Sequence, residues 1–388
     1  MRIAVVGGKL QGIEAAYLAR MAGWEILMID KNPDAPARGL ADSFFRFDVT
    51  SDLKELYPLL NDVELIIPAL ENQKALHSLE SLAGQINSAL AFDFESHAVT
   101  ASKKESDRLF RKWGFPSPQY WPQCGFPLIA KPSGLSGSRG IQKIRNETDL
   151  AVFEEKEKKA NLEERWIIQE FLEGPSYSIE VIGFNGCFLP LQATVIEVDR
   201  TYDCKRVRAP ADLPQILDRQ FADMAEATGK HLNLKGIMDM EVIRHGNQLK
   251  ILEIDARLPS QTPTAVLKST GINMMEHLYT VFVEQKTPSI ELGPEAKNVV
   301  LEHIRVTPDC LDVCGEHIMS AARPLRHERN FFGADEALTD FDPQYPEWVA
   351  TLIITDASAD AVAAKSTHVH ENIQSTFGLP LCLESIPA

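Results

Sequence analysis

The sequence predicts an α/β protein with more than one domain, and three stretches of the chain support this prediction. Residues 2–30 alternate an apolar strand, a helix and a second strand, which is how a parallel nucleotide-binding sheet begins. Residues 126–141 place a lysine and a run of small residues between two strands. Residues 236–262, called the acidic hairpin below, contain two apolar runs interrupted by carboxylates. With 388 residues, the chain is long enough for two or three domains.

The composition is that of a soluble globular chain with excess negative charge. It is 44% hydrophobic and 24% charged, and its formal net charge is −16. This charge argues against nucleic acid or an anionic membrane as a partner. No apolar run approaches the length of a membrane span, and the six cysteines are too scattered to complete a zinc site. We therefore expect a cytoplasmic protein with free thiols.

The N-terminal segment predicts a Rossmann-like domain with a low tendency to bind NAD. The turn after the first strand carries Lys9 where a dinucleotide-binding turn needs a glycine that lets the backbone approach the pyrophosphate. Polar side chains should gather beyond the carboxyl ends of the strands, where α/β sheets bind ligands. These side chains are Gln11, Asp30, Glu71 and Asn72. A purely structural role at a loop or a helix start remains open for Asp30 and Glu71.

The segment around Lys131 predicts a loop that folds over phosphate groups. A helix over 97–116, which contains Lys103, leads through several prolines to a strand that ends at Lys131. The small residues of 133–140 follow, and a second strand starts at Ile141. Backbone amides of such a loop can approach phosphate oxygens closely, and the lysine adds positive charge. The segment is not a P-loop, because no Gly-Lys-Ser/Thr opens a helix.

The acidic hairpin poses an electrostatic problem. Side chains alternate between the faces of a strand, so Asp239 and Glu241 share one face. Glu253 and Asp255 share a face of the partner strand. A three-residue turn centred on Asn247 would bring all four carboxylates onto one face, whereas a two-residue turn would separate the pairs. Carboxylates on one face repel each other, so this face favours a cation such as Mg²⁺ bound to a nucleotide phosphate. The alternative is a solvated outer face.

The remaining chain predicts further sheet and helix elements. Strands are expected at 166–172, 176–183, 188–198, 299–306 and 348–354, helices at 148–160, 214–231, 271–286 and 357–377, and a polar loop at 201–206. The pattern divides the chain into residues 1–95, 96–290 and 291–388. We expect the last of these to be a small α+β domain that caps the sheet.

The order of these segments resembles the ATP-grasp ligases along the whole chain. Within that superfamily, five stretches are similar to the pyrrolysine-biosynthesis ligases, the PylC family: 7–17, 30–33, 201–204, 235–239 and 253–264. The resemblance implies an ATP-grasp fold with an N-terminal Rossmann-like domain (1–95), an ATP-grasp domain (96–290) and a small C-terminal α+β domain. It places a nucleotide lid subdomain at about 115–183 and the catalytic hairpin at 236–262.

The resemblance also implies an activity. It indicates an enzyme that uses ATP and Mg²⁺ to join the carboxylate of (3R)-3-methyl-D-ornithine to the ε-amine of L-lysine through an acyl phosphate. The alternatives are another ATP-grasp amino-acid or peptide ligase, a carbamoyl-phosphate-synthase-like enzyme or, less favoured, an NAD-dependent oxidoreductase. The oligomeric state stays open, with a homodimer as one option.

Residue roles follow from the same resemblance. The nucleotide-binding residues are Lys103, Lys131, Ser136, Gly137, Gly140, Gln169, Glu170, Phe171, Leu172 and Glu173. The Mg²⁺ ligands are Glu241, Glu253 and Asp255. The substrate-binding residues are Leu10, Gln11, Glu71, Ser178, Ile179, Glu180, Asp239, Arg257, Ser260 and Thr262. Arg257 and Lys131 stabilise the transferred phosphoryl group, and Glu180 or Asp239 accepts the proton of the amine. Ser176 departs from the family pattern, which has a ribose-binding acid there, and Glu173 is its expected replacement.

Overall fold

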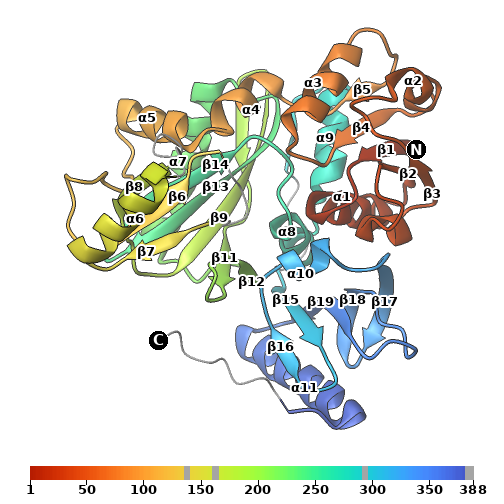
Figure 1. Cartoon of the computed structure of the whole chain (residues 1–388). Helices are drawn as coiled ribbons and strands as arrows, with labels where there is room; N and C mark the ends of the chain where they lie inside the picture. The colour runs from red at the N-terminus through yellow and green to blue at the C-terminus, as the bar shows by residue number, and fades with distance from the viewer. Residues whose placement is uncertain (135–139, 160–165, 291–295, 381–388) are drawn as a thin grey trace.

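The computed structural model describes residues 1–134, 140–159, 166–290 and 296–380, which form three sheets with helices around them (Figure 1). The predicted lid residues Ser136 and Gly137 lie outside the described residues. The chain begins with a parallel sheet of order β3-β2-β1-β4-β5. Its elements are β1 (Arg2–Val6), α1 (Leu10–Met21), β2 (Glu25–Asp30), η1 (Pro36–Leu40), β3 (Ser43–Arg46), α2 (Leu53–Asn61), β4 (Leu65–Pro68), α3 (Gln73–Leu82) and β5 (Ala89–Leu90).

Strand β1 shows why this sheet forms. Ile3 and Val5 belong to the core on the side of α1, and Ala4 and Val6 to the core on the opposite side. A strand that is buried on both faces is an unbroken apolar run, as expected of a parallel sheet covered by helices. The sequence interpretation missed β3, because its side chains are partly or fully exposed at the sheet edge and carry little apolar signal.

A small antiparallel sheet of order β7-β6-β8 carries the predicted phosphate lysine. The elements of this region are α4 (Phe94–Thr100), α5 (Lys103–Trp113), β6 (Leu128–Pro132), β7 (Gln142–Ile144), α6 (Glu147–Lys159) and β8 (Trp166–Glu170). The single helix predicted over 97–116 is wrong. The extended backbone of Ser102 separates two helices, so Lys103 is the first residue of α5 rather than a mid-helix residue.

The largest sheet runs in the order β14-β13-β9-β11-β12-β15-β19-β18-β17, with β10 paired to β9 and β16 to β15. Its strands are β9 (Ser176–Phe184), β10 (Cys187–Pro190), β11 (Thr194–Val198), β12 (Cys204–Ala209), β13 (Gly236–His245), β14 (Gln248–Asp255), β15 (Asn298–Val306), β16 (Leu311–Val313), β17 (Arg326–Phe331), β18 (Ala334–Thr339) and β19 (Trp348–Asp356). The accompanying helices are α7 (Gln215–Leu232), α8 (Thr262–Thr270), α9 (Met274–Phe282), α10 (His317–Ser320) and α11 (Ala359–Phe377).

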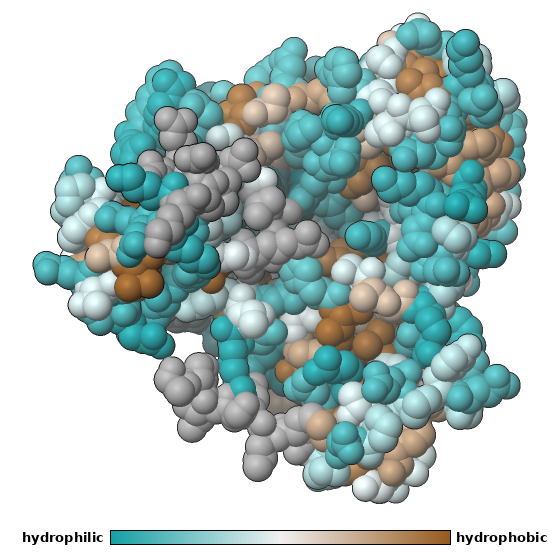
Figure 2. Space-filling view, viewed as in Figure 1, coloured by the Kyte–Doolittle hydropathy of each residue, from teal (hydrophilic) through white to brown (hydrophobic). Residues whose placement is uncertain are grey.

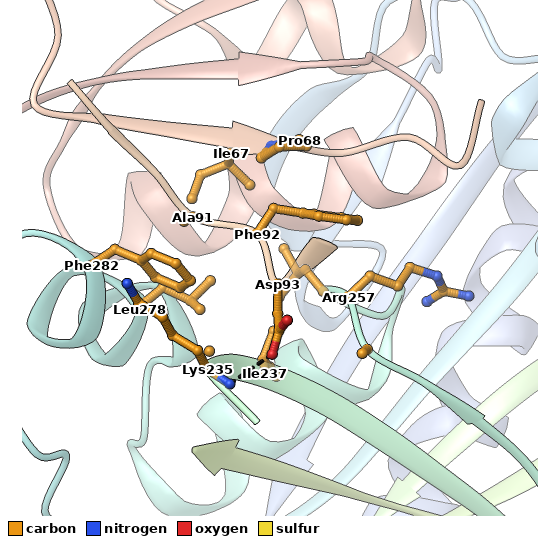
Figure 3. Close-up of a pocket in the computed structure, with 13 residues that line it drawn as sticks. Ile67, Pro68, Ala91, Phe92, Asp93, Lys235, Ile237, Arg257, Leu278 and Phe282 are labelled. Atoms are coloured by element: carbon orange, nitrogen blue, oxygen red, sulfur yellow. Dashed lines mark hydrogen bonds between the residues drawn. The ribbon is translucent and has the colours of Figure 1, made fainter. Parts of the chain in front are cut away.

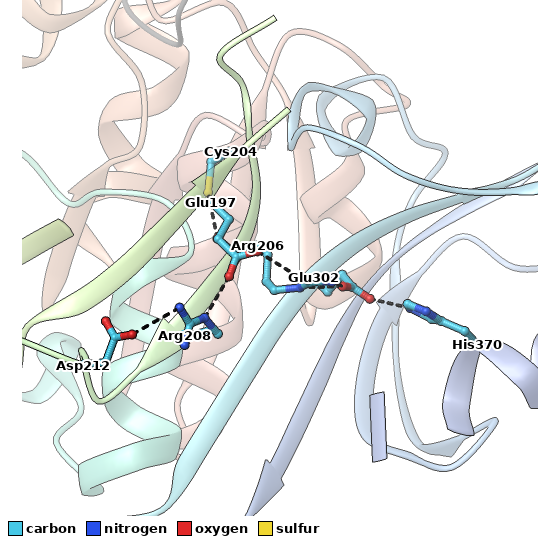
Figure 4. A network of polar contacts seen from close by, with 7 residues as sticks. All are labelled: Glu197, Cys204, Arg206, Arg208, Asp212, Glu302 and His370. Atoms are coloured by element: carbon cyan, nitrogen blue, oxygen red, sulfur yellow. Dashed lines mark hydrogen bonds and ion pairs between the residues drawn. The ribbon is translucent and has the colours of Figure 1, made fainter. Parts of the chain in front are cut away.

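The C-terminal strands continue this sheet instead of capping it. Strand β12 pairs with β15 over Arg206–Ala209, so the backbone hydrogen bonds run without a break into the C-terminal segment. The polar loop predicted at 201–206 is therefore partly wrong, because β12 begins at Cys204. Figure 4 shows Glu302 of β15 between Arg206 and His370. Arg206 Nε donates to Glu302 Oε1 at 2.6 Å, and His370 binds the other carboxylate oxygen.

The acidic hairpin has a shorter turn than predicted, but its acidic residues pair as predicted. His245 pairs with Gln248, so the turn contains only two residues, Gly246 and Asn247, instead of three. The register then shifts by one residue after Val242, where β14 carries an extra residue, Leu252. This β-bulge compensates for the short turn, because one extra residue restores the alternation of faces. Asp239 consequently lies opposite Asp255, and Glu241 lies opposite Glu253.

The structure can be compared with what the composition predicted about the surface, membrane spans and cysteines. The face shown in Figure 2 is largely hydrophilic, with hydrophobic residues in separate patches. Among the described residues, none of the helices combines the length and the apolar character that a membrane span requires. Cys124, Cys187, Cys204 and Cys314 are free thiols, but Cys310 forms a disulfide, so the expectation of free thiols is wrong for that residue.

Candidate active site on the acidic hairpin

Three neighbouring strands present two rows of polar side chains on one face. Asp239 of β13 lies opposite Glu180 of β9 and opposite Asp255 of β14. Directly opposed residues of antiparallel strands project to the same side of a sheet. The first row is therefore Glu180, Asp239 and Asp255, and the second is Ser178, Glu241 and Glu253.

The opposite face of these strands is core, which explains why the rows are fixed. Met240 lies between Ile179 and Ile254 in the ladder, and all three are at most 1% exposed. They pack in one cluster with Phe221 and Ala225 of α7. The alternation of apolar and acidic residues along β13 thus separates core from site. Ile179, predicted to bind substrate, belongs to this core, so its side chain does not face the acidic rows.

Burial raises the pKa of several carboxylates in these rows, because the charged form is poorly solvated. It raises the pKa of Glu180, Glu241 and Asp255 to about 7, and it raises the pKa of Asp239 well above its ordinary value. Neighbouring carboxylates raise the pKa of Glu241 and Asp239 further. A charged form that is poorly solvated and surrounded by like charges favours the binding of cations.

The pH dependence of stability should report this burial. We expect the melting temperature to fall as the pH rises from 5.5 to 7, because the folded protein then holds protons that the unfolded chain has released. For Glu180, a shift from 4.5 to about 7 corresponds to about 3 kcal/mol at most. Glu180→Gln should flatten this slope, whereas Glu226→Gln, at an exposed position of α7, should not. Equal slopes for wild type and Glu180→Gln in thermal melts would contradict the assignment.

Two positively charged side chains, Arg257 and Lys103, contact the carboxylates of these rows. Arg257 follows β14, and its guanidinium lies 2.9 Å from Asp255 Oδ2, 2.8 Å from Glu71 Oε1 and 4.0 Å from Asp239 Oδ1. Lys103, at the start of α5, forms an ion pair with Glu253. The negative charges of Asp255 and Glu241 also act on Lys103, and the charge of Glu253 also acts on Arg257, so each cation compensates more than one acid.

Arg257 also lines a cavity at the junction of the N-terminal sheet and the hairpin (Figure 3). The cavity wall contains the end of β4 at Ile67 and Pro68, and Ile237 of β13. Figure 3 shows the Arg257 guanidinium on the side away from Phe282. Glu71 reaches Arg257 from the loop after β4, and Gln11 Nε2 donates to Glu71 at 3.0 Å. The predicted residues Gln11, Glu71 and Arg257 are therefore brought together.

The predicted nucleotide-binding residues that the structure describes lie between the small sheet and the hairpin. Lys131 is 7% exposed, its Nζ lies 3.4 Å from the backbone oxygen of Leu252, and burial lowers its pKa. Glu170 accepts from the Gln119 amide at 2.9 Å and pairs with Lys250 of β14. Most of the remaining predicted nucleotide-binding residues lie at or just after the end of β8. Gln169 and Leu172 are buried, Glu173 lies 3.6 Å from Lys143, Phe171 lies under Lys143, and Gly140 has φ +77°.

Removing the buried lysine should weaken nucleotide binding selectively. We expect Lys131→Met to raise the Kd for ATP about tenfold or more, because a charged hydrogen-bond donor to phosphate is lost. Isothermal titration calorimetry would measure the change. The exposed Lys230→Met on α7 is the matched control and should leave the Kd unaltered. An unchanged Kd for Lys131→Met would remove this residue from the nucleotide site.

The structure settles the role of Asp30 and reveals residues that the sequence did not indicate. Both carboxylate oxygens of Asp30 accept backbone amides, from Gly8 and Asn32 at 2.7 Å, so its structural role is the one observed. Glu14 and Gln261 are buried next to the predicted residues Leu10 and Ser260 in a second cavity. Helix α8 was not predicted either. Thr262 is its first residue and is 5% exposed. Only the rarity of a buried acid in an apolar helix could have marked Glu14.

Comparison with known proteins identifies the family. A model of the ATP-grasp domain family matches residues 100–261. The chain is 37% identical to the 3-methyl-D-ornithine–L-lysine ligase of Methanosarcina acetivorans over 82% of this chain and 84% of the relative. The chain belongs to the 3-methyl-D-ornithine–L-lysine ligase family. The ligase of the same name from Methanosarcina mazei is 38% identical over 82% of each chain.

This ligase family has the ATP-grasp fold that the sequence predicted. The structure of the Hydrogenobacter thermophilus 2-oxoglutarate carboxylase biotin carboxylase domain, in complex with MgADP and bicarbonate, matches with a TM-score of 0.73. The match covers 94% of this chain and 88% of that chain at 14% identity, so it shows the shared fold alone. The predicted α/β class and ATP-dependent ligase activity are confirmed. The segment 100–261 contains Lys103, Lys131, both acidic rows and Arg257.

Proposed function

We propose that the protein joins the carboxylate of (3R)-3-methyl-D-ornithine to the ε-amine of L-lysine at the expense of ATP, as a step of pyrrolysine biosynthesis. The observation that carries this proposal is the row of Glu180, Asp239 and Asp255 with Arg257 beside it. Buried carboxylates of this kind bind substrates with amino groups, and both proposed substrates are diamines. The arginine supplies the positive charge that a carboxylate substrate and the acyl phosphate formed from it require.

The nucleotide is proposed to bind between the small sheet and the hairpin. Lys103 and Lys131 would contact phosphate oxygens, Gln169 to Glu173 would contact the adenosine, and Gly140 would lie near the phosphates. The Hydrogenobacter thermophilus domain of the same fold is described in complex with MgADP, which is consistent with nucleotide binding by this fold. We assign one role to each predicted domain. Residues 1–95 would supply substrate contacts, residues 96–290 would form the nucleotide site, and residues 291–388 would support the turn between β14 and α8.

The residues present fit Mg²⁺ that arrives with the nucleotide. Among the described residues, no three His, Cys, Asp or Glu side chains are arranged to hold a metal by themselves. Mg²⁺ in nucleotide sites is usually held by one or two carboxylates together with phosphate oxygens, so such a cage is not needed. Glu241, Glu253 and Asp255 offer hard oxygen ligands on adjacent strands. When bound, the ion would neutralise phosphate charge as the phosphoryl group is transferred.

The proposed reaction has two steps. The carboxylate of methylornithine attacks the γ-phosphorus of ATP, a P–O bond to ADP breaks, and an acyl phosphate forms. Arg257 and Lys131 stabilise the charge on the transferred group. The neutral ε-amine of lysine then attacks the acyl carbon, and inorganic phosphate leaves. The amine loses one proton to Glu180 or Asp239, and the pKa of about 7 suits Glu180 to accept it near neutral pH.

The substrates are proposed to lie on opposite sides of Arg257. Ser178, Glu180 and Asp239 of the acidic rows, together with Ser260 and Thr262 of the turn that follows β14, would hold methylornithine. Leu10, Gln11 and Glu71 reach the site from the N-terminal sheet and would hold lysine. Both substrates and ATP are cytoplasmic small molecules, so the protein is proposed to act in the cytoplasm.

The deciding experiment is ADP release with each amino acid omitted in turn. We expect full turnover only with ATP, 3-methyl-D-ornithine and L-lysine together, and stoichiometric formation of the amide by mass spectrometry. Turnover with another amino-acid pair alone would point to a different ATP-grasp ligase. Turnover with bicarbonate and an ammonia source would point to a carbamoyl-phosphate-synthase-like enzyme. ADP release that needs neither amino acid would overturn the proposal.

A further inference from the structure

The turn between β14 and α8 contains one glutamine whose backbone is unusual. Gln261 has φ +71° and ψ −51° and is 6% exposed. Residues with a side chain rarely adopt positive φ, so the surrounding structure must hold this conformation. Its neighbours in the chain are Ser260 and Thr262, which the proposed function places at the substrate. The conformation of Gln261 therefore sets where these two residues stand.

The C-terminal part of the chain holds the side chain of Gln261. Its Oε1 lies 2.7 Å from His303 Nε2 of β15, and its Nε2 donates to Glu316, which immediately precedes α10. An amide oxygen only accepts, so His303 Nε2 carries the proton in this arrangement. His303 Nδ1 is then free to accept from the Thr351 hydroxyl, which lies 2.8 Å away. His303 and Glu316 are at most 9% exposed, so water cannot easily replace these bonds.

The N-terminal helix holds the backbone of the same turn. The carboxylate of Glu14 in α1 accepts the Thr264 amide at 2.6 Å, and the nearby Gln261 amide acts to lower the pKa of Glu14. Helix α8 therefore receives its N-terminal cap from another domain. A cavity at this point is lined by Leu10, Glu14, Ser260, Gln261, His303 and Glu316. Segments from all three parts of the chain thus meet at one glutamine.

We infer that Gln261 is a positioning residue through which the C-terminal segment fixes the substrate-binding turn for ligation. The inference rests on the proposed function, because it concerns the binding of the two amino acids. A different side-chain anchor at residue 261 would rotate Ser260 and Thr262 relative to Arg257. The nucleotide contacts proposed on β6 and β8 belong to another sheet and should not move. Positioning by Gln261 should therefore affect the amino acids and leave ATP binding unaffected.

A reciprocal exchange tests the inference. In Gln261→Glu a second carboxylate would face Glu316, and we expect kcat/KM for both amino acids to fall about tenfold or more as the buried hydrogen bond is lost. The KM for ATP should stay within about twofold. Adding Glu316→Gln restores one donor and one acceptor in the pair, because the new amide can donate to the new carboxylate. We expect the double variant to recover to within about threefold of wild type.

Two further variants separate positioning from stability. Gln285→Glu is the matched control, since Gln285 also has positive φ (+54°) but lies beyond α9, away from the acidic rows. It should leave all kinetic constants unchanged. If Gln261→Glu fails to fold, Gln261→Gly removes the side-chain anchor while tolerating φ +71°. This variant should keep the melting temperature within a few degrees and still lose amino-acid kcat/KM.

The outcomes are distinguishable. Unchanged amino-acid kcat/KM in Gln261→Glu and Gln261→Gly would overturn the inference, as would an equal rise in KM for ATP. A double variant that regains its melting temperature but not its turnover would also overturn it, because the restored hydrogen bond between residues 261 and 316 would then support the fold without positioning the substrates. Wild-type ADP release that does not depend on both amino acids would count against the proposed function instead.

Discussion

Glu253→Gln should abolish ligation while the protein remains folded. Glu253 lies opposite Glu241 on the acidic face and forms an ion pair with Lys103. Replacing its charge removes a proposed Mg²⁺ ligand and the partner that orients Lys103 towards the nucleotide. We expect kcat to fall about a thousandfold, the scale of losing a group that stabilises transferred charge. The assay is ADP release in the presence of both amino acids.

The fold should tolerate this change, because the amide relieves repulsion between neighbouring carboxylates. Burial and the charge of Glu253 together raise the pKa of Glu241 to about 7, so the variant should lower that pKa. The melting temperature should therefore stay close to that of wild type at pH 8, because this relief offsets the lost ion pair with Lys103. Glu276→Gln, on an exposed position of α9, is the matched control and should retain full activity. Retained ligation by Glu253→Gln would remove the hairpin from the active site.

Arg257→Ala should destabilise the protein and inactivate it. Arg257 contacts Glu71, Asp255 and Asp239, and all three carboxylates lose their common cation in the variant. Leaving buried charges without a partner costs about 3–5 kcal/mol. We expect this loss in the free energy of unfolding at pH 8, measured by urea titration. At pH 5.5 the loss should shrink, because the pKa values of Asp239 and Asp255 are raised and the acids become protonated.

Arg257→Lys separates charge from geometry. A lysine restores one positive charge but lacks the planar fork that reaches several oxygens at once. This variant should regain most of the stability and little of the turnover. Arg219→Ala, at an exposed position of α7, serves as the control and should change neither quantity. An Arg257→Ala protein that is as stable as wild type at pH 8 would show that the acids are not compensated by this residue.

Much of the site could be predicted from the sequence, because its strands and helices show a clear periodicity of apolar residues. The strand before Lys131, the two apolar runs of the hairpin and the βαβ opening each have a periodicity that survives without tertiary context. The stretch 253–264 was specific enough to indicate the family. Short edge strands such as β3 and β16 were missed, because three or four partly exposed residues show no clear alternation.

The pairing of the acids shows the limit of local reasoning. The sequence required an odd-numbered turn around Asn247, and the structure has a two-residue turn with a bulge at Leu252 instead. Both routes put Asp239 opposite Asp255, since a single extra residue anywhere between them restores the alternation. The location of that residue depends on inter-strand hydrogen bonds and on packing against α7, which no local pattern records.

Local sequence patterns were sufficient to predict the fold class, the ligase family and the acidic face with its lysines. The surroundings of these residues became known from the tertiary structure. Glu71 reaches Arg257 across 186 positions of the chain, and Glu14 and Glu316 meet at Gln261 from opposite ends. Such contacts depend on how separate sheets and helices dock against one another. Their energies come from burial and charge in the assembled site, which a linear pattern of residues does not specify.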